Sequence, residues 1–322
     1  MTLTPLSESE IPHVVDLINR CNVLDGPNIR VDVEELRQEL DSSLTETSRD
    51  VRVARLDTGR IVGIVWTLHL PSATAPQRCD IEGYVDTELR GRGLGRELMS
   101  WGIDHARELL TSADSRAGHP ERAIRASRSS TNATAARLHH EMGFVDVRWF
   151  DDLQRPLDGL PDLVIPSGVT IEPWPTEPAH LLAALEVKNR AFTDHWGSVP
   201  TTPDGWQEMM YGYGARPDLS AVACDATSGE IVAVLLARRY PADDEIRGHR
   251  EAWISTLGTL ASHRGRGIAS ALVAHAMHRF RDAGLTHAMI GVDADNPSGA
   301  HRIYRGLGFV DHVRIVTSEI VL

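Results

Sequence analysis

Two short stretches of arginine and glycine have the composition and spacing of a loop that binds phosphate. The first runs from Arg90 to Arg96 and the second from Arg264 to Ser270. Apolar residues at helical spacing follow each stretch, so backbone N–H groups would point outward there at the positive end of a helix dipole. Glycine suits such a loop because a side chain would block the anion and because the turn can require a positive φ. The alternative for one such loop, taken alone, is a purely structural turn before a helix.

Two other kinds of phosphate-binding loop do not fit these stretches. Both stretches lack the third glycine of the GxGxxG pattern with an acidic residue about 20 positions later. Neither contains the GKS or GKT sequence of a nucleoside triphosphatase. These spacings exclude a dinucleotide-binding fold and a nucleoside triphosphatase.

The loops are part of a longer internal repeat. Arg90 and Arg264 open the two loops 174 residues apart, and the Gly-Phe pairs that begin at Gly143 and Gly308 lie 165 residues apart. Similar spacing over most of the chain indicates two copies of one domain.

The domain boundaries follow from this repeat. We predict a first domain at residues 1–154 and a second at residues 169–322. Residues 155–168 contain three prolines and no periodic apolar stripe, which is typical of a semi-extended linker. A chain of 322 residues also exceeds one typical domain.

Each copy alternates strands and helices around its glycine loop. In the second copy we predict a strand at 253–260, a helix at 269–280 that stops at Gly284, and a buried strand at 287–292. The first copy has the same helix at 99–110. Paired β-rich runs around short turns predict two hairpins, at 51–56 with 60–68 and at 219–224 with 230–237. The predicted class is α/β, as a mixed sheet in each of two tandem domains.

Composition limits the partners of the chain. With 33 Lys and Arg against 45 Asp and Glu, the net charge of -12 would repel nucleic acid and attract small cations. The longest apolar run, Ile231–Ala237, is far shorter than the roughly 20 residues of a membrane helix. Residues 1–5 lack the features of a signal peptide, so we expect a cytoplasmic protein without a membrane partner. The three cysteines are too scattered to clamp a metal, and no metal site is predicted.

The doubled motifs resemble the GCN5-related N-acetyltransferase (GNAT) superfamily. The acetyl-CoA loop of that family follows the pattern Arg or Gln, two residues, Gly, one residue, Gly or Ala. Here RGRGIA is followed by Asn296 and by AHRIYRGLGF at 300–309, and RGRGLG is followed by Asn132 and by AARLHHEMGF at 135–144. The resemblance covers essentially the whole chain as two tandem domains. Among tandem members, GVDADNPSGAHRIYRGLGF at 291–309 is most similar to mycothiol synthase-like actinobacterial acetyltransferases.

This resemblance implies that acetyl-CoA is the cofactor and that both copies could bind it. The strand before each loop would bind the pantetheine and polarise the thioester carbonyl. The implied strand residues are Leu257, Gly258 and Thr259 in the second copy and Gly83, Tyr84 and Val85 in the first. The implied loop residues are Arg264, Gly265, Arg266, Gly267, Ile268, Ala269 and Ser270, with Asn296, and Arg90, Gly91, Arg92, Gly93, Leu94, Gly95 and Arg96.

Direct transfer to an amine needs a base for the ammonium and an acid for the leaving thiolate. Tyr304 stands where many members of the superfamily carry a tyrosine acid, and a packed aromatic is the alternative. Glu251 is the expected base, with Glu82 as its counterpart, and for both the alternative is a solvated strand end. The spacing from Glu251 to the loop is longer than in mycothiol synthase, which leaves a bulge or a different base open. His139 replaces the tyrosine in the first copy, so we expect the second domain to be catalytic and the first degenerate.

Aromatic and acidic residues early in the second copy are candidates for the acceptor site. Asp194 could meet an ammonium. The aromatic residues that could line the site, each of which could equally belong to the local core, are Phe192, Trp196, Trp206, Tyr211 and Tyr213. The expected function is acetyl-CoA-dependent N-acetyl transfer to a primary amine of a small molecule. The alternatives are a protein or peptide N-acetyltransferase and a non-catalytic acetyl-CoA-binding regulator. We expect a monomer or a homodimer.

Overall fold

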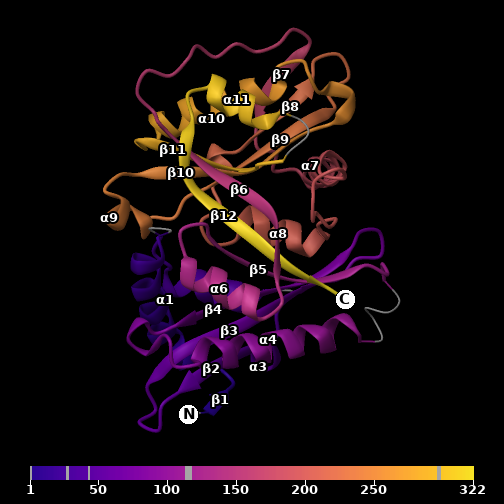
Figure 1. The fold of residues 1–322 in the computed structure, drawn as a ribbon. Coiled ribbons are helices and arrows are strands. Elements are labelled where there is room, and N and C mark those ends of the chain that lie inside the picture. Colours follow the sequence, from indigo (N-terminus) through magenta and orange to yellow (C-terminus); the bar gives the residue numbers. More distant parts are fainter. Residues whose placement is uncertain (1, 27–28, 43, 113–117, 296–298) are drawn as a thin grey trace. The chain divides into compact units, whose positions relative to one another are not determined.

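The chain packs as two compact units (Figure 1). The structure is a computed structural model that describes residues 2–26, 29–42, 44–112, 118–295 and 299–322. Unit 1 contains Met1–Trp149 together with Val313–Leu322, and unit 2 contains Phe150–His312. Each unit is a mixed sheet with helices on both faces, which confirms the predicted α/β class.

Unit 1 has a sheet in the order β1-β2-β3-β4-β5-β12. The strands are β1 (Thr2–Thr4), β2 (Val51–Arg55), β3 (Ile61–Leu70), β4 (Gln77–Val85), β5 (Arg122–Ser129) and most of β12 (Val310–Val321). The helices are η1 (Glu8–Glu10), α1 (Ile11–Asp25), α2 (Val33–Leu40), α3 (Thr47–Asp50), η2 (Thr87–Leu89), α4 (Leu94–Leu110) and α6 (Ala133–Glu141). Apolar residues of α1 and α2 pack with Ile64 and Trp66 on one face of the sheet, and those of α4 pack with Val65 and Ile81 on the other.

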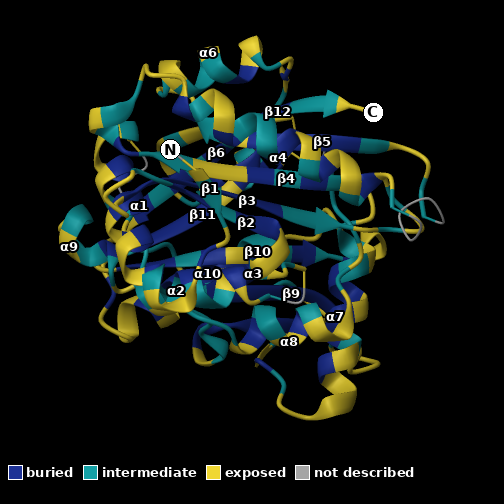
Figure 2. Ribbon diagram, turned by 90° about the horizontal axis from the view of Figure 1, so that it is seen from below, coloured by how far each residue is buried: buried dark blue, intermediate teal, exposed yellow. Residues whose placement is uncertain are grey.

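Unit 2 repeats this plan with a sheet in the order β6-β11-β10-β9-β8-β7. The strands are β6 (Val145–Pro156), β7 (Val169–Pro173), β8 (Ala221–Asp225), β9 (Ile231–Arg238), β10 (Glu251–Thr259) and β11 (His287–Asp293). The helices are α7 (Pro178–Ala191), α8 (Pro203–Tyr211), η3 (Pro217–Leu219), α9 (Asp243–Arg247), η4 (Ala261–His263), α10 (Ile268–Asp282) and α11 (Ala300–Gly306). Figure 2 shows the helices banded in buried and exposed colours, as expected of amphipathic helices that cover a sheet. Across the described part of the chain, no helix has the length and apolar character to cross a membrane.

The last strand of each repeat belongs to the other unit. From Ile315 to Val321, β12 pairs antiparallel with β5 of unit 1, where the yellow C-terminal strand ends in Figure 1. From Phe150 to Pro156, β6 pairs antiparallel with β11 of unit 2. The packing units therefore differ from the expected division at 1–154, 155–168 and 169–322, because the repeats exchange their last strands. Residues 157–168 of the expected linker contain no helix or strand.

Deleting residues 313–322 should unfold unit 1. The deletion removes the strand that completes the edge of β5, including buried Val316 and Ser318. The deletion exposes the edge of β5 to solvent. It also removes buried apolar side chains, each of which stabilises the folded state by about 1.5–3 kcal/mol. This loss is a large fraction of the stability of a small domain. Hydrogen exchange should show lost protection in β4 and β5, with β10 and β11 protected as in the intact chain. Unchanged protection in β5 would contradict this account.

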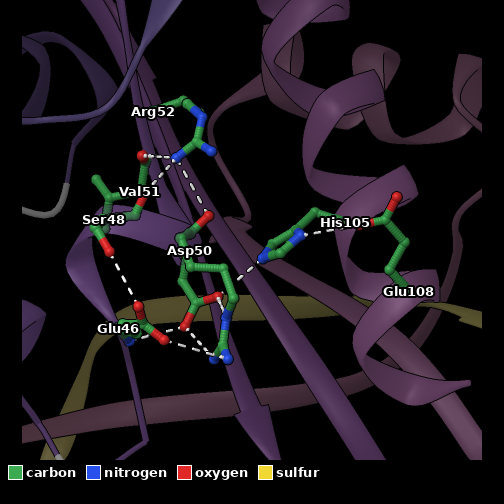
Figure 3. Close-up of polar contacts among 8 residues, drawn as sticks. Glu46, Ser48, Asp50, Val51, Arg52, His105 and Glu108 are labelled. Atoms are coloured by element: carbon green, nitrogen blue, oxygen red, sulfur yellow. Dashed lines mark hydrogen bonds and ion pairs between the residues drawn. The ribbon is translucent and has the colours of Figure 1, made fainter. Parts of the chain in front are cut away.

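A buried ionic network fastens α3 to α4 in unit 1 (Figure 3). Asp50 is 1% exposed and lies 2.8 Å from Nε2 of His105. Arg49 donates two hydrogen bonds to the same carboxylate, at 2.7 and 2.9 Å. Burial alone would raise the pKa of Asp50, but the hydrogen bonds from His105 and Arg49 outweigh it and hold the pKa well below its usual value. This network is structural, and it positions α4, which follows the first glycine loop.

Candidate active site

In each unit two parallel strands pair at one end and separate at the other. In unit 1 the register of β4 with β5 runs from Gln77 to Ile81 and ends before Glu82. In unit 2 the register of β10 with β11 runs from Glu251 to Ile254. Beyond these points the backbone groups of β4 and β10 can hydrogen-bond an extended ligand in place of the missing neighbour strand. The strand residues predicted to bind the cofactor lie on these two separated segments.

The glycine loops follow directly and form open cradles. Gly93 and Gly267 have φ of 90° and 82° and precede α4 and α10, where no side chain caps the first N–H groups. A Cβ added at Gly91, Gly93 or Gly265 would meet nothing within 4 Å. An uncapped helix N-terminus with free space in front of it fits a pyrophosphate. The observed loops therefore have the geometry that the predicted cofactor needs.

The two cradles differ in what lies beside them. In unit 2 a Cβ on Gly267 would lie 3.6 Å from Cγ of Pro166, so the segment that precedes β7 runs past this loop. His278 of α10 also lies 2.9 Å from the carbonyl oxygen of Pro161. Of the two glycines that directly precede a helix, Gly93 therefore has the more open surroundings.

The arginines of the loops divide into two kinds. Arg92 and Arg266 are exposed beside the cradles and can contact an anion. Arg90 and Arg264 instead donate hydrogen bonds within their own units. Arg96 lies 2.5 Å from Glu141. Three of the arginines predicted to contact phosphate therefore have protein partners in this structure, namely Arg90, Arg264 and Arg96.

Glu82 lies at the point where β4 leaves β5. It is exposed to solvent and accepts a hydrogen bond of 2.8 Å from the hydroxyl of Tyr84. The surrounding protein removes enough water to raise the pKa of Glu82, and the charge of Asp80 raises it further. Glu82 is thus an accessible carboxylate with raised proton affinity, immediately beyond the last strand pair.

Two further side chains join Glu82 on the same face of the sheet. Trp66 pairs opposite Glu82 in the β3–β4 register, and its ring stacks on Tyr84 with centroids 6.0 Å apart. Burial and the charge of Glu82 raise the pKa of Glu39, on α2, to about 8, and Trp66 hydrogen-bonds to the same carboxyl. Trp66 is 4% exposed and belongs to the core, and Glu39 with a pKa of about 8 is mostly protonated at pH 7, so Glu82 carries the charge that could meet an ammonium group. Sequence reasoning missed Glu39 and Trp66, because neither lies in a recognisable motif.

Glu251 has a different environment from the one expected. Its side chain is 2% exposed and is held by Arg247 at 2.9 Å, His249 at 2.8 Å and Trp253 at 3.1 Å. It is the first residue of β10, so about 13 Å of strand separates it from Ser255, where the strands part. Its burial and its position both count against a direct proton transfer to this carboxylate, and its role as the base stays a prediction.

The strand registers also change which residues correspond between the repeats. Gln77 and Glu251 each begin a nine-residue strand and each begin a parallel register. The counterpart of Glu82 is therefore Thr256, and Glu251 corresponds to Gln77. A bulge at Ser255 interrupts the pairing of β10 with β9, whereas β4 pairs regularly with β3. The long spacing from Glu251 to the glycine loop suggested a bulge as one possibility, and β10 contains one.

Tyr304 and His139 occupy matching positions in the two units. Each accepts a hydrogen bond of 3.0 Å at its carbonyl from the phenylalanine five residues later. Tyr304 is 6% exposed, and burial raises the pKa of its hydroxyl. Burial lowers the pKa of His139 to about 4, so the imidazole is neutral at pH 7. A neutral imidazole is a poor counterpart for a tyrosine acid, and the acid role of Tyr304 stays a prediction.

The Nδ1 atom of His139 faces the exchanged strand. It lies 3.3 Å from the hydroxyl of Ser318, which donates to Asp146 at 2.7 Å. Because the single hydroxyl proton goes to Asp146, Ser318 can only accept from His139, which places the imidazole proton on Nδ1. This ring therefore directs its one proton into the protein.

The predicted acceptor residues of unit 2 lie at and beyond the end of α7. Phe192 is half-buried, and its ring would be 3.0 Å from a Cβ on Gly258. Asp194 is 74% exposed and lies 3.6 Å from Arg264. Trp196 is half-buried with its ring 6.2 Å from that of Phe150. Trp206 is 1% exposed in the core, so it does not line a site. Asn296 lies outside the described residues.

Comparisons with known proteins agree with this geometry. The sequence pattern of the Acetyltransferase (GNAT) family matches residues 14–144 and 182–309. A mycothiol acetyltransferase of Tsukamurella paurometabola is 30% identical over 265 residues, which cover 80% of this chain and 82% of that protein. Another, of Streptomyces avermitilis, is 27% identical over 97% of this chain and 92% of its own length.

Solved structures show the same fold. A GCN5-related N-acetyltransferase from Sphaerobacter thermophilus has a TM-score of 0.78 at 22% identity, covering 99% of this chain and 95% of that one. A tandem GNAT protein from the clavulanic acid biosynthesis pathway has a TM-score of 0.76 at 17% identity, covering 99% and 98%. The chain is therefore an acyltransferase that belongs to the Acetyltransferase (GNAT) family and carries two copies of its fold.

Proposed function

We propose that this protein transfers an acetyl group from acetyl-CoA to a primary amine of a small molecule. The observation that carries the proposal is the combination, in both units, of separated parallel strands with an uncapped glycine cradle. Acetyl-CoA would supply the activated thioester. Gly93 and Gly267 leave room for its pyrophosphate, and the strand segments Gly83–Val85 and Leu257–Thr259 offer backbone groups to the pantetheine and the thioester carbonyl.

The amine acceptor is supported by the acidic and aromatic side chains beside the separated strands of unit 1. Glu82 provides the negative charge for an ammonium, and the half-buried ring of Tyr84 lies beside it. The named relatives are mycothiol acetyltransferases, which supports a small acceptor over a peptide.

We propose Glu82 as the base that takes the proton of the ammonium. Acyl transfer forms a C–N bond and breaks the C–S bond, so one proton must leave nitrogen and one thiolate must leave carbon. At pH 7 an ammonium with a pKa of about 10.4 costs about 4.6 kcal/mol to deprotonate. A thiol with a pKa of about 8.5 needs only about 2 kcal/mol to leave as a thiolate. The base therefore matters more than the acid.

This comparison bears on which unit is productive. Unit 1 has an accessible carboxylate at the separated strands, whereas the corresponding residue of unit 2 is Thr256, which is 5% exposed. Unit 2 has Tyr304 in the position of the acid. The expectation that unit 2 is catalytic rests on that tyrosine and stays a prediction. The energetic argument favours unit 1, and we propose it as the productive unit.

Calorimetric titration with acetyl-CoA should show two sites per chain, because both cradles have the same backbone geometry. We expect the unit 1 site to bind more tightly, since Pro166 lies beside Gly267 and a Cβ on Gly93 would meet nothing. Release of free thiol should then follow addition of a small primary amine, with peptides of free N-terminus as the comparison panel. Absence of acetyl-CoA binding would refute the proposed function, and turnover of peptides alone would replace the acceptor class.

A further inference from the structure

The first arginine of each glycine loop makes a set of contacts that the phosphate role does not explain. In unit 1, Nε of Arg90 donates to the carbonyl oxygen of Val85 at 3.2 Å. Its two terminal nitrogens donate to the carboxylate of Asp25 at 2.6 and 2.8 Å. Val85 ends the strand before the loop, and Asp25 ends α1. One side chain thus joins the strand, the loop and the end of the first helix.

Unit 2 repeats this arrangement with different partners. Nε of Arg264 donates to the carbonyl oxygen of Thr259 at 3.2 Å, and Nη2 donates to that of Ala191 at 2.9 Å. Thr259 ends β10 and Ala191 ends α7. The third contact is an ion pair of 3.6 Å with Asp194. The same three elements are joined twice in one chain, although the residues at the helix ends differ.

The shape of a guanidinium suits it to joining several parts of the backbone. Its planar fork presents five donors in fixed directions, so it can hold several acceptors at once. Its positive charge is also stabilised at the negative end of a helix. Because the guanidinium groups of Arg90 and Arg264 already have partners of this kind, we assign contact with the anion to the exposed side chains of Arg92 and Arg266.

We propose that Arg90 and Arg264 are positioning residues that couple occupancy of the glycine loop to the end of the first helix in their own unit. This inference rests on the proposed function, since it takes coenzyme A as the ligand of the loop. A ligand that fixes the loop would fix the arginine, and through it the helix end. Allosteric coupling of this kind requires that the helix end be less mobile when the loop is occupied.

The helix ends are linked to elements that we propose to bind the acceptor. In unit 1, Cys21 of α1 donates to the same Val85 carbonyl at 3.2 Å, and α1 shares its core with α2, which carries Glu39. In unit 2, Phe192 follows Ala191 and packs against Gly258. Binding of the donor at the loop would therefore prepare the acceptor side of the same unit.

The two links differ in strength. Arg90 and Asp25 form a two-point ion pair with side chains 26% and 20% exposed. Asp194 is 74% exposed and makes a single longer contact with Arg264. Charge-assisted pairs with two parallel hydrogen bonds are stronger than exposed ion pairs. We therefore expect closer coupling in unit 1 than in unit 2.

Hydrogen exchange with and without coenzyme A tests the proposal without any measure of turnover. In the natural protein, coenzyme A should slow exchange at least threefold in peptides covering residues 19–26 and 187–194. Arg90→Gln should remove the change at 19–26 and keep it at 187–194. Arg264→Gln should do the reverse, so each variant is the control for the other.

Calorimetry on the same samples separates positioning from ligand contact. Arg90→Gln should weaken coenzyme A binding less than Arg92→Gln does, because Arg90 already has a protein partner. Asp25→Asn leaves both loop arginines in place and should still remove the change at 19–26, which guards against a folding defect in Arg90→Gln. The proposal is overturned if coenzyme A binds and neither peptide changes, or if both variants alter both peptides alike. Failure of the natural protein to bind coenzyme A would instead refute the proposed function.

Discussion

Gly93→Val should lower acetyl transfer by at least 100-fold, whereas Gly267→Val should leave most of it. Both glycines have positive φ and precede a helix, so a β-branched residue would distort the loop and fill the space in front of the first N–H groups. The difference is expected because unit 1 contains the accessible carboxylate. Calorimetry should show loss of one acetyl-CoA site in each variant, and a thiol-release assay should show which site supports turnover.

Two hairpin glycines provide matched controls for backbone strain. Gly59 has φ of 85° and Gly229 has φ of 74°, and a Cβ added at either would meet nothing within 4 Å. Valine there should cost stability through the same left-handed conformation, by about 1–2 kcal/mol, without touching a loop. Full activity in Gly59→Val would show that the loss in Gly93→Val arises at the cradle. The opposite result, with Gly267→Val inactive and Gly93→Val active, would show that unit 2, which contains Tyr304, is the catalytic unit.

The repeat and its glycine loops could be predicted from sequence because their constraints are local. A positive φ before a helix requires glycine, and the residue types are therefore visible at Gly93 and Gly267. Strand, loop and helix follow one another within about 40 residues, so hydrophobic periodicity was sufficient to find them. The observed β10 and α10 lie within a few residues of their predicted ranges.

The exchange of β6 and β12 could not be predicted in the same way. Both strands run antiparallel to their neighbours, so either could complete the sheet edge at β5 or at β11. The choice depends on tertiary packing, such as the contacts of Ser318 with His139 and Asp146, which come from distant parts of the chain. Periodicity within a strand carries no information about which edge it will join.

The burial of Glu251 and the exposure of Glu82 could not be predicted from the sequence either. Glu251 and Glu82 both precede a glycine loop on a strand, but one is enclosed by Arg247, His249 and Trp253 and the other is open beside Tyr84. The bulge at Ser255 and the register of each parallel pair decide this, because they set which residue meets the point of separation. Counting residues back from the loop could not reveal either feature.

Glu82→Gln should lower kcat/KM by roughly 10² to 10⁴, the usual contribution of a positioned general base. The carboxylate accepts a proton only when ionised, so the rate of the natural protein should rise with pH through the raised pKa of Glu82. Glutamine cannot titrate, and this acidic limb should vanish from the pH profile. Glu39 has a pKa of about 8 and is therefore protonated over this limb, so Glu39→Gln should leave the limb in place.

Glu251→Gln provides the contrasting control for this experiment. Neutralising a carboxylate held by Arg247 and His249 leaves a buried positive charge without its partner, which should destabilise the protein by about 3–5 kcal/mol. The acidic limb of kcat/KM should remain in that variant, since the base is elsewhere. Tyr304→Phe should lower kcat by less than Glu82→Gln does, because the coenzyme A thiolate needs little protonation by a general acid in order to leave. An unaltered pH profile in Glu82→Gln, together with a large loss in Tyr304→Phe, would return the chemistry to unit 2.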